Sequence, residues 1–201
     1  MNSSQRLAQG HELAAWIEQL VYDLPLPDSV RTRLAGTCFL IAQEHHQAIL
    51  LLLSQAQPMH APAFALVRPV FDTYIRGLWL AQCATDADLE RFAQGKSPPN
   101  MRAMLTAIEQ VPEFDSGQLS EIHRRSWSLM CAYTHTGSQQ VLRWSANEAI
   151  QPNYSVEEIK EVLSFTGALA LLSTLGLASI AANELLAESV LAKACKFSYQ
   201  F

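Results

Sequence analysis

Three charged side chains interrupt the apolar stretch of residues 59–83 at intervals of four residues: Arg68, Asp72 and Arg76. On a helix this spacing places them in one stripe, where a carboxylate between two guanidinium groups can pair in both directions. Buried charges cost several kcal/mol unless they are paired, so a buried stripe predicts a ligand site or an ion network. A stripe that faces solvent or a subunit boundary is the alternative, and the sequence leaves both open.

Arg124 and His135 lie on the same face of one predicted helix and form a second candidate cluster. In RNA cleavage an imidazole exchanges a proton with the attacking or leaving oxygen, while a guanidinium holds phosphate charge. These two residues are the candidate catalytic pair, with Arg68, Arg76 or His46 as candidate assistants from facing helices. The competing interpretation of His135 is an ordinary histidine at a helix C-terminus, where the helix dipole favours the charged ring.

The remaining histidines and the cysteines give no metal signature. Metal-binding helical bundles use Glu-x-x-His, which places acid and imidazole one turn apart, and this spacing is absent from the chain. We therefore group His46 with the Arg68, Asp72 and Arg76 stripe as a ligand or interface cluster, and expect no metal and no cofactor. The four scattered cysteines indicate small core residues in a reducing compartment.

Length and composition indicate one soluble domain over residues 1–201. The chain has 201 residues, 49% of them hydrophobic, which is enough to bury a substantial core. Its 14 basic and 19 acidic residues give a net charge of −5, so there is no broad electrostatic footprint for nucleic acid. The N-terminal residues lack the apolar run of a secretion signal, and we expect a cytoplasmic protein.

Hydrophobic spacing and helix-breaking residues predict an all-α protein, a bundle of four long helices with two or three short ones. The predicted helices cover about residues 7–24, 28–57, 59–83, 85–94, 101–112, 115–137 and 139–149, followed by a long helix that begins after Ser155. Ser155 with Glu158 forms a capping box, as does Thr85 with Asp88. Pro69 removes a backbone donor and predicts a kink that frees a carbonyl.

The final long helix has no charge between Glu161 and Glu184, so a membrane span over about residues 162–183 is an alternative. Several serine and threonine residues and a glycine lower the hydrophobicity of this segment, and neither end carries a cluster of Lys or Arg. Small residues along one face instead suit a central helix or a dimer seam, because they allow a close approach of another helix. We expect burial inside the protein, and no membrane.

Two segments resemble uncharacterised bacterial helical proteins: LVRPVFDTYIRGLWL (residues 66–80) and AYTHTG (residues 132–137). The resemblance covers about residues 45–137. Those proteins are similar to the HEPN group of helical bundles, which are often dimeric and include ribonucleases of toxin-antitoxin and phage-defence systems. The resemblance implies a helical bundle, a homodimer and an origin in bacteria.

The HEPN nuclease motif itself is missing. Active members carry an arginine, a polar residue, three to five further residues and a histidine on one helix. Arg125 and Ser126 start this pattern, but His135 follows too late; Arg6 and His11 have the spacing, with an apolar residue in the polar position. The sequence therefore favours a non-catalytic, dimeric binding or regulatory module with a protein partner or small ligand, and the alternative is a HEPN-like ribonuclease or toxin-type enzyme.

Overall fold

The computed structural model describes residues 2–145 and 150–197, and these residues form helices and loops without a strand. The predicted all-α fold class is confirmed. The helices are α1 (Ser3–Val21), α2 (Val30–Leu53), α3 (His60–Ala65), α4 (Val67–Gln82), α5 (Asp86–Ala93), α6 (Met101–Ile108), the 3₁₀ helix η1 (Pro112–Phe114), α7 (Gln118–Thr134), α8 (Ser138–Trp144), α9 (Val156–Ile180) and α10 (Glu184–Phe197).

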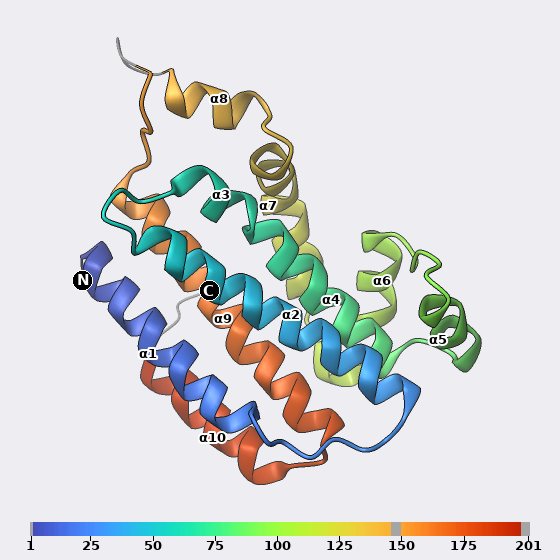
Figure 1. Ribbon diagram of the computed structural model, residues 1–201. Coiled ribbons are helices and arrows are strands. Elements are labelled where there is room, and N and C mark those ends of the chain that lie inside the picture. The colour runs from blue at the N-terminus through green and yellow to red at the C-terminus, as the bar shows by residue number, and fades with distance from the viewer. Residues whose placement is uncertain (1, 146–149, 198–201) are drawn as a thin grey trace.

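Helix α9 lies at the centre of the bundle and packs against α1, α2, α4 and α10 (Figure 1). Helices α2 and α4 form an antiparallel pair beside it. The shorter helix α6 and the longer α7 pack against α4, and α8 lies at one end of the molecule, where it contacts α7. Helix α4 therefore lies between the central helices and the α6–α7 layer.

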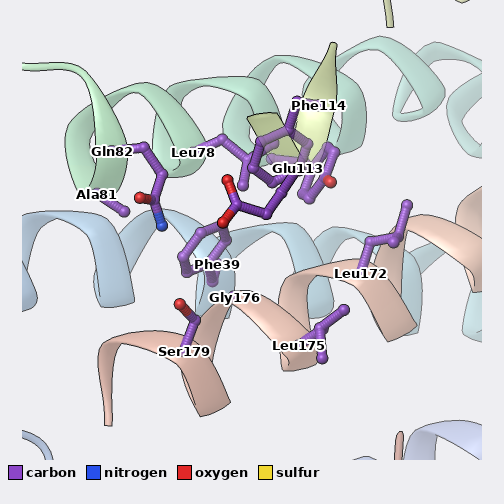
Figure 2. A pocket seen from close by; sticks show the side chains of 11 residues that line it. Phe39, Leu78, Ala81, Gln82, Glu113, Phe114, Leu172, Leu175, Gly176 and Ser179 are labelled. Carbon is purple, nitrogen blue, oxygen red and sulfur yellow. The ribbon is translucent and has the colours of Figure 1, made fainter. Parts of the chain in front are cut away.

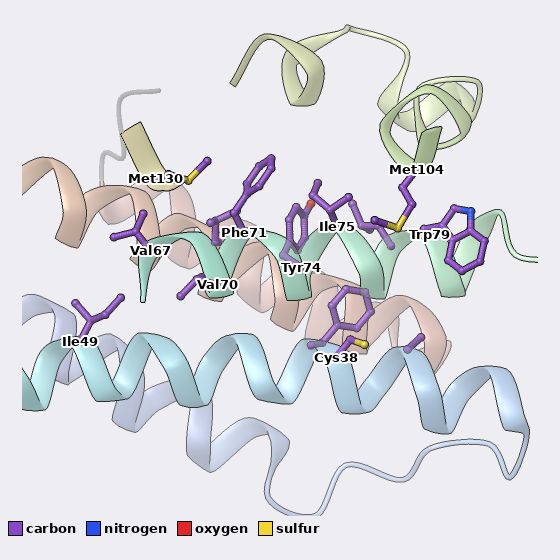
Figure 3. Close-up of a cluster of buried hydrophobic side chains, with 14 of the residues drawn as sticks. Cys38, Ile49, Val67, Val70, Phe71, Tyr74, Ile75, Trp79, Met104 and Met130 are labelled. Atoms are coloured by element: carbon purple, nitrogen blue, oxygen red, sulfur yellow. The ribbon is translucent and has the colours of Figure 1, made fainter. Parts of the chain in front are cut away.

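The side chain of Phe39 fills the point where α2, α4 and α9 meet. It is fully buried, and its ring passes so close to Gly77 and Gly176 that a Cβ atom on either glycine would lie within 2.6 Å of the ring. The two glycines thus allow the backbones of α4 and α9 to approach this aromatic ring. Figure 3 shows the surrounding core, in which Met104 and Met130 cover α4 from the α6 and α7 side.

The apolar helix α9 is long enough to cross a membrane, but two thirds of its most apolar window, 67%, is buried inside the protein. Its small residues Ala170, Thr174 and Ala178 are buried within the same chain. This agrees with a soluble protein whose central helix is covered by its neighbours. The chain turns after Ile180, with Ala182 in a left-handed conformation, and returns as α10, a helix that we did not predict.

The break near Pro69 separates α3 from α4. The sequence predicted one kinked helix over residues 59–83; the structure instead has two helices joined at Leu66. The kink is confirmed, and the carbonyl that it frees is satisfied, because the hydroxyl of Thr134 donates to the Ala65 oxygen at 3.1 Å. This hydrogen bond ties the end of α7 to the end of α3.

Helix ends agree with the predicted capping boxes at Thr85 and Ser155, which are both present. The turn after α7 differs from the prediction that Gly137 ends this helix. Thr136 takes the left-handed conformation, and Gly137 is instead the N-cap residue of α8. The predicted stretch 139–149 corresponds to α8, with residues 146–149 outside the described residues.

Candidate binding site

Arg68 lies at the centre of a polar cluster between α4 and α7. Its Nη1 atom donates a hydrogen bond of 2.7 Å to Nε2 of His135, and its Nε atom lies 3.4 Å from a carboxylate oxygen of Asp72. The guanidinium carbon is 4.6 Å from the centre of the Trp127 ring, which is within cation–π distance. We refer to Arg68, Asp72, Trp127 and His135 as the Arg68 site.

The packing of α7 on α3 and α4 positions these side chains. Met130 and Tyr133 are the buried residues of α7, and they anchor one face of this helix against the core. Trp127 and His135 are two turns apart, about 12 Å along the helix axis. Arg68 stands in the first turn of α4, just after the break, and thereby reaches both residues.

The geometry of the site fixes the role of each polar group. Because a guanidinium can only donate, Nε2 of His135 must accept, and the ring proton therefore resides on Nδ1. Burial raises the pKa of the Asp72 carboxyl, and the positive charges of Arg68 and Arg76 oppose this. The side chains of Arg68 and Asp72 are each 22% exposed, so the ion pair is accessible from solvent at its edge.

Trp127 also lines a groove of about 510 Å³ between α6 and α7. Arg102, His123 and Arg124 supply basic groups there, and the other lining residues are Leu105, Thr106, Ser120 and Ser128. The rings of His123 and Trp127 lie 4.7 Å apart. Burial lowers the pKa of His123, and the positive charge of Arg102 acts in the same direction. Trp127 belongs to both the Arg68 site and this groove.

Arg124 and His135 make no contact with each other among the described residues. The two residues are eleven positions apart, about 16 Å along the helix axis. Arg124 instead pairs with Glu121, which also pairs with Arg125, and these hydrogen bonds lower the pKa of Glu121 to about 2. The structure thus places His135 beside Arg68 and not beside its predicted catalytic partner.

The other two predicted site residues have different surroundings. Arg76 is half-buried one turn beyond Asp72 and acts on that carboxyl through its charge. His46 is 1% exposed in the α2–α9 interface, where its Nδ1 lies 3.0 Å from the hydroxyl of Thr166. His46 therefore lies apart from the stripe with which we had grouped it.

Sequence reasoning missed Trp127, Arg102 and His123. The spacing of residues 120, 123, 124, 127 and 128 is three and four, which places them on one helix face. That pattern was visible, but nothing in it identified α6 as the facing helix. Among the described residues, there is no group of three or more His, Cys, Asp or Glu side chains that could hold a metal.

A known protein family covers both parts of the site. Its model matches residues 39–201, from the middle of α2 to the end of the chain. The chain belongs to DUF6988, a family of unknown function. The Arg68 site and the groove both lie inside the DUF6988 match. No curated protein and no solved structure matches the chain.

Proposed function

We propose that this DUF6988 protein is a non-catalytic, homodimeric binding or regulatory module of the bacterial cytoplasm, and that it holds a phosphate-bearing small molecule at the Arg68 site. The observation that carries the proposal is the arrangement of Arg68, whose guanidinium is held at once by Asp72, His135 and the Trp127 ring. Fixing a guanidinium in this way reduces the entropy that it loses when it binds an anion.

The chemistry of the site suits a phosphate. One Nη1–H of Arg68 donates a hydrogen bond to His135, and further N–H groups of the guanidinium are available to donate to a ligand. The Nδ1–H of His135 is another donor beside it. Arg102 adds positive charge along the groove, and Trp127 offers an aromatic surface for a ring attached to the phosphate.

The same geometry supports binding over catalysis. A histidine acts as a general base through an unprotonated nitrogen, and in His135 this nitrogen accepts a hydrogen bond from Arg68. Arg124 lies about 16 Å from His135 along the axis of α7, which is too far for these two side chains to act on one phosphate. The pair on which a HEPN-like ribonuclease would depend therefore lacks the required proximity.

Exposed apolar side chains near α8 support a dimer. Val141 is 52% exposed and Leu142 61% exposed, and Leu129 on α7 is also exposed. Helix α8 lies at one end of the molecule (Figure 1), and covering these side chains would remove apolar surface from water. The small-residue face of α9 is already buried within the chain, so the α8 end is the better candidate for the dimer contact.

Native mass spectrometry of the detergent-free protein tests this proposal. The chain mass is 22.3 kDa, and we expect a species of twice this mass. Substituting both exposed residues, Val141→Glu with Leu142→Glu, should give the single-chain mass, because buried unpaired carboxylates oppose association. A single-chain mass for the unchanged protein would contradict the dimer, and a dimer that survives the double substitution would exclude α8 as its contact.

A further inference from the structure

A second cavity lies on another part of the molecule, between α2, α4, α9 and η1. Its volume is about 330 Å³, which lies within the range of small-molecule pockets. Figure 2 shows the side chains that line it. None of the Arg68 site residues is among them, so the two sites are separate.

The cavity has an apolar interior and a polar mouth. Phe39, Tyr74 and Leu78 are buried, and further apolar walls come from Ala81, Phe114, Leu172, Leu175 and Gly176. Gln82, Glu113 and Ser179 are exposed. In Figure 2 the Glu113 carboxylate extends toward the space between Gln82 and Ser179. A molecule bound here would place its apolar part inside and a polar end at the mouth.

The mouth is suited to a cation. Glu113 forms no ion pair among the described residues, and no basic side chain lines the cavity. The Gln82 carbonyl and the Ser179 hydroxyl are further acceptors among the exposed residues that line the cavity. A primary ammonium group has three N–H donors, which matches three acceptors of this kind.

Tyr74 contributes a hydroxyl to the lining of the cavity. Its side chain is 2% exposed and lines the cavity; its hydroxyl forms no hydrogen bond to the described residues and is not among the buried polar atoms without a partner, so it is in contact with the open space. Burial raises the pKa of Tyr74, which keeps the hydroxyl protonated and able to donate. A polar atom of a ligand in the cavity would take the place of water as the partner of this hydroxyl.

We propose that this cavity binds a small aromatic primary amine that carries a hydroxyl group. The ammonium group pairs with Glu113 at the mouth, and the aromatic body packs among Phe39, Phe114 and Tyr74. The ligand hydroxyl exchanges a hydrogen bond with the Tyr74 hydroxyl. A carboxylate in place of the ammonium group is disfavoured, because it would face Glu113 with the same charge.

Calorimetric titration with tyramine tests the charge preference. We expect tyramine to bind the full-length protein at least tenfold more tightly than 4-hydroxyphenylpropionate, which carries a carboxylate in place of the amine. Glu113→Gln should weaken tyramine binding about tenfold, the equivalent of roughly 1.4 kcal/mol for a charge-assisted hydrogen bond. Glu90→Gln, which changes an exposed acid on α5, should leave tyramine binding unchanged.

Phenethylamine, which lacks the hydroxyl group, tests the role of Tyr74. Tyr74→Phe should weaken tyramine binding several-fold and leave phenethylamine binding unchanged. The proposal is overturned if tyramine does not bind, if the carboxylate analogue binds equally well, or if Glu113→Gln has no effect. Glu113 is exposed, so its substitution keeps the test valid even if Tyr74→Phe fails to fold.

Discussion

Replacement of Phe39 by alanine is expected to lower the free energy of unfolding by about 3–5 kcal/mol. The ring is fully buried where α2, α4 and α9 meet, and Gly77 and Gly176 leave no side chain that could move into the vacated space. The loss combines the transfer free energy of the ring with the cost of the cavity that remains. Urea denaturation followed by circular dichroism measures it.

Phe92→Ala is the matched control, because it removes the same ring from a half-buried position on α5. We expect this substitution to cost clearly less than Phe39→Ala, since part of the Phe92 ring is already in contact with water. Equal losses in the two variants would contradict the central packing role of Phe39. A loss below about 1 kcal/mol for Phe39→Ala would do the same.

Acidification is expected to destabilise the protein through His46. Burial in the α2–α9 interface lowers the pKa of His46 from 6.5 to about 4, and the nearby charge of His11 acts in the same direction. Between these two pH values the unfolded chain binds a proton that the folded protein does not. Stability is therefore complete above pH 6.5 and falls as the pH drops to 4, by roughly 3 kcal/mol in total.

Urea denaturation at pH 7 and pH 4.5 measures this loss in three proteins. His46→Gln should show a smaller loss of stability than the unchanged protein, because glutamine does not titrate and can still bond to Thr166. His45→Gln should retain most of the loss, since His45 is only half-buried and Glu44 opposes the lowering of its pKa. Equal pH dependence in the unchanged protein and His46→Gln would exclude His46 as the cause.

Local sequence patterns were sufficient to predict most of the helices and several of their ends. The capping boxes at Thr85 and Ser155 depend on residues three apart, and the kink at Pro69 follows from its missing N–H. Helix α10 was missed because the α9 apolar run continues to Glu184 without a proline or glycine to mark the turn at Ala182.

The site was only partly predictable, since it depends on contacts that are distant in the sequence. The four-residue spacing brought Arg68 and Asp72 together correctly, and they form an ion pair. His135 is 67 residues from Arg68, and only the packing of α7 on α4 makes them neighbours. The helical pattern indicated that His46 lies on a buried face of α2. It did not indicate which helix packs on that face, and the structure shows that this helix is α9 and not α4.

Calorimetric titration of adenosine monophosphate into the unchanged protein, Arg68→Ala and Arg33→Ala is the most direct test of the Arg68 site. This probe combines a phosphate for Arg68 with an aromatic ring for Trp127. Arg33 is the control because it is an exposed arginine that, among the described residues, pairs only with the exposed Asp28. Loss of charge-assisted hydrogen bonds should weaken binding tenfold or more in Arg68→Ala, and Arg33→Ala should bind normally. Equal binding by all three proteins, or no binding by the unchanged one, would contradict the account.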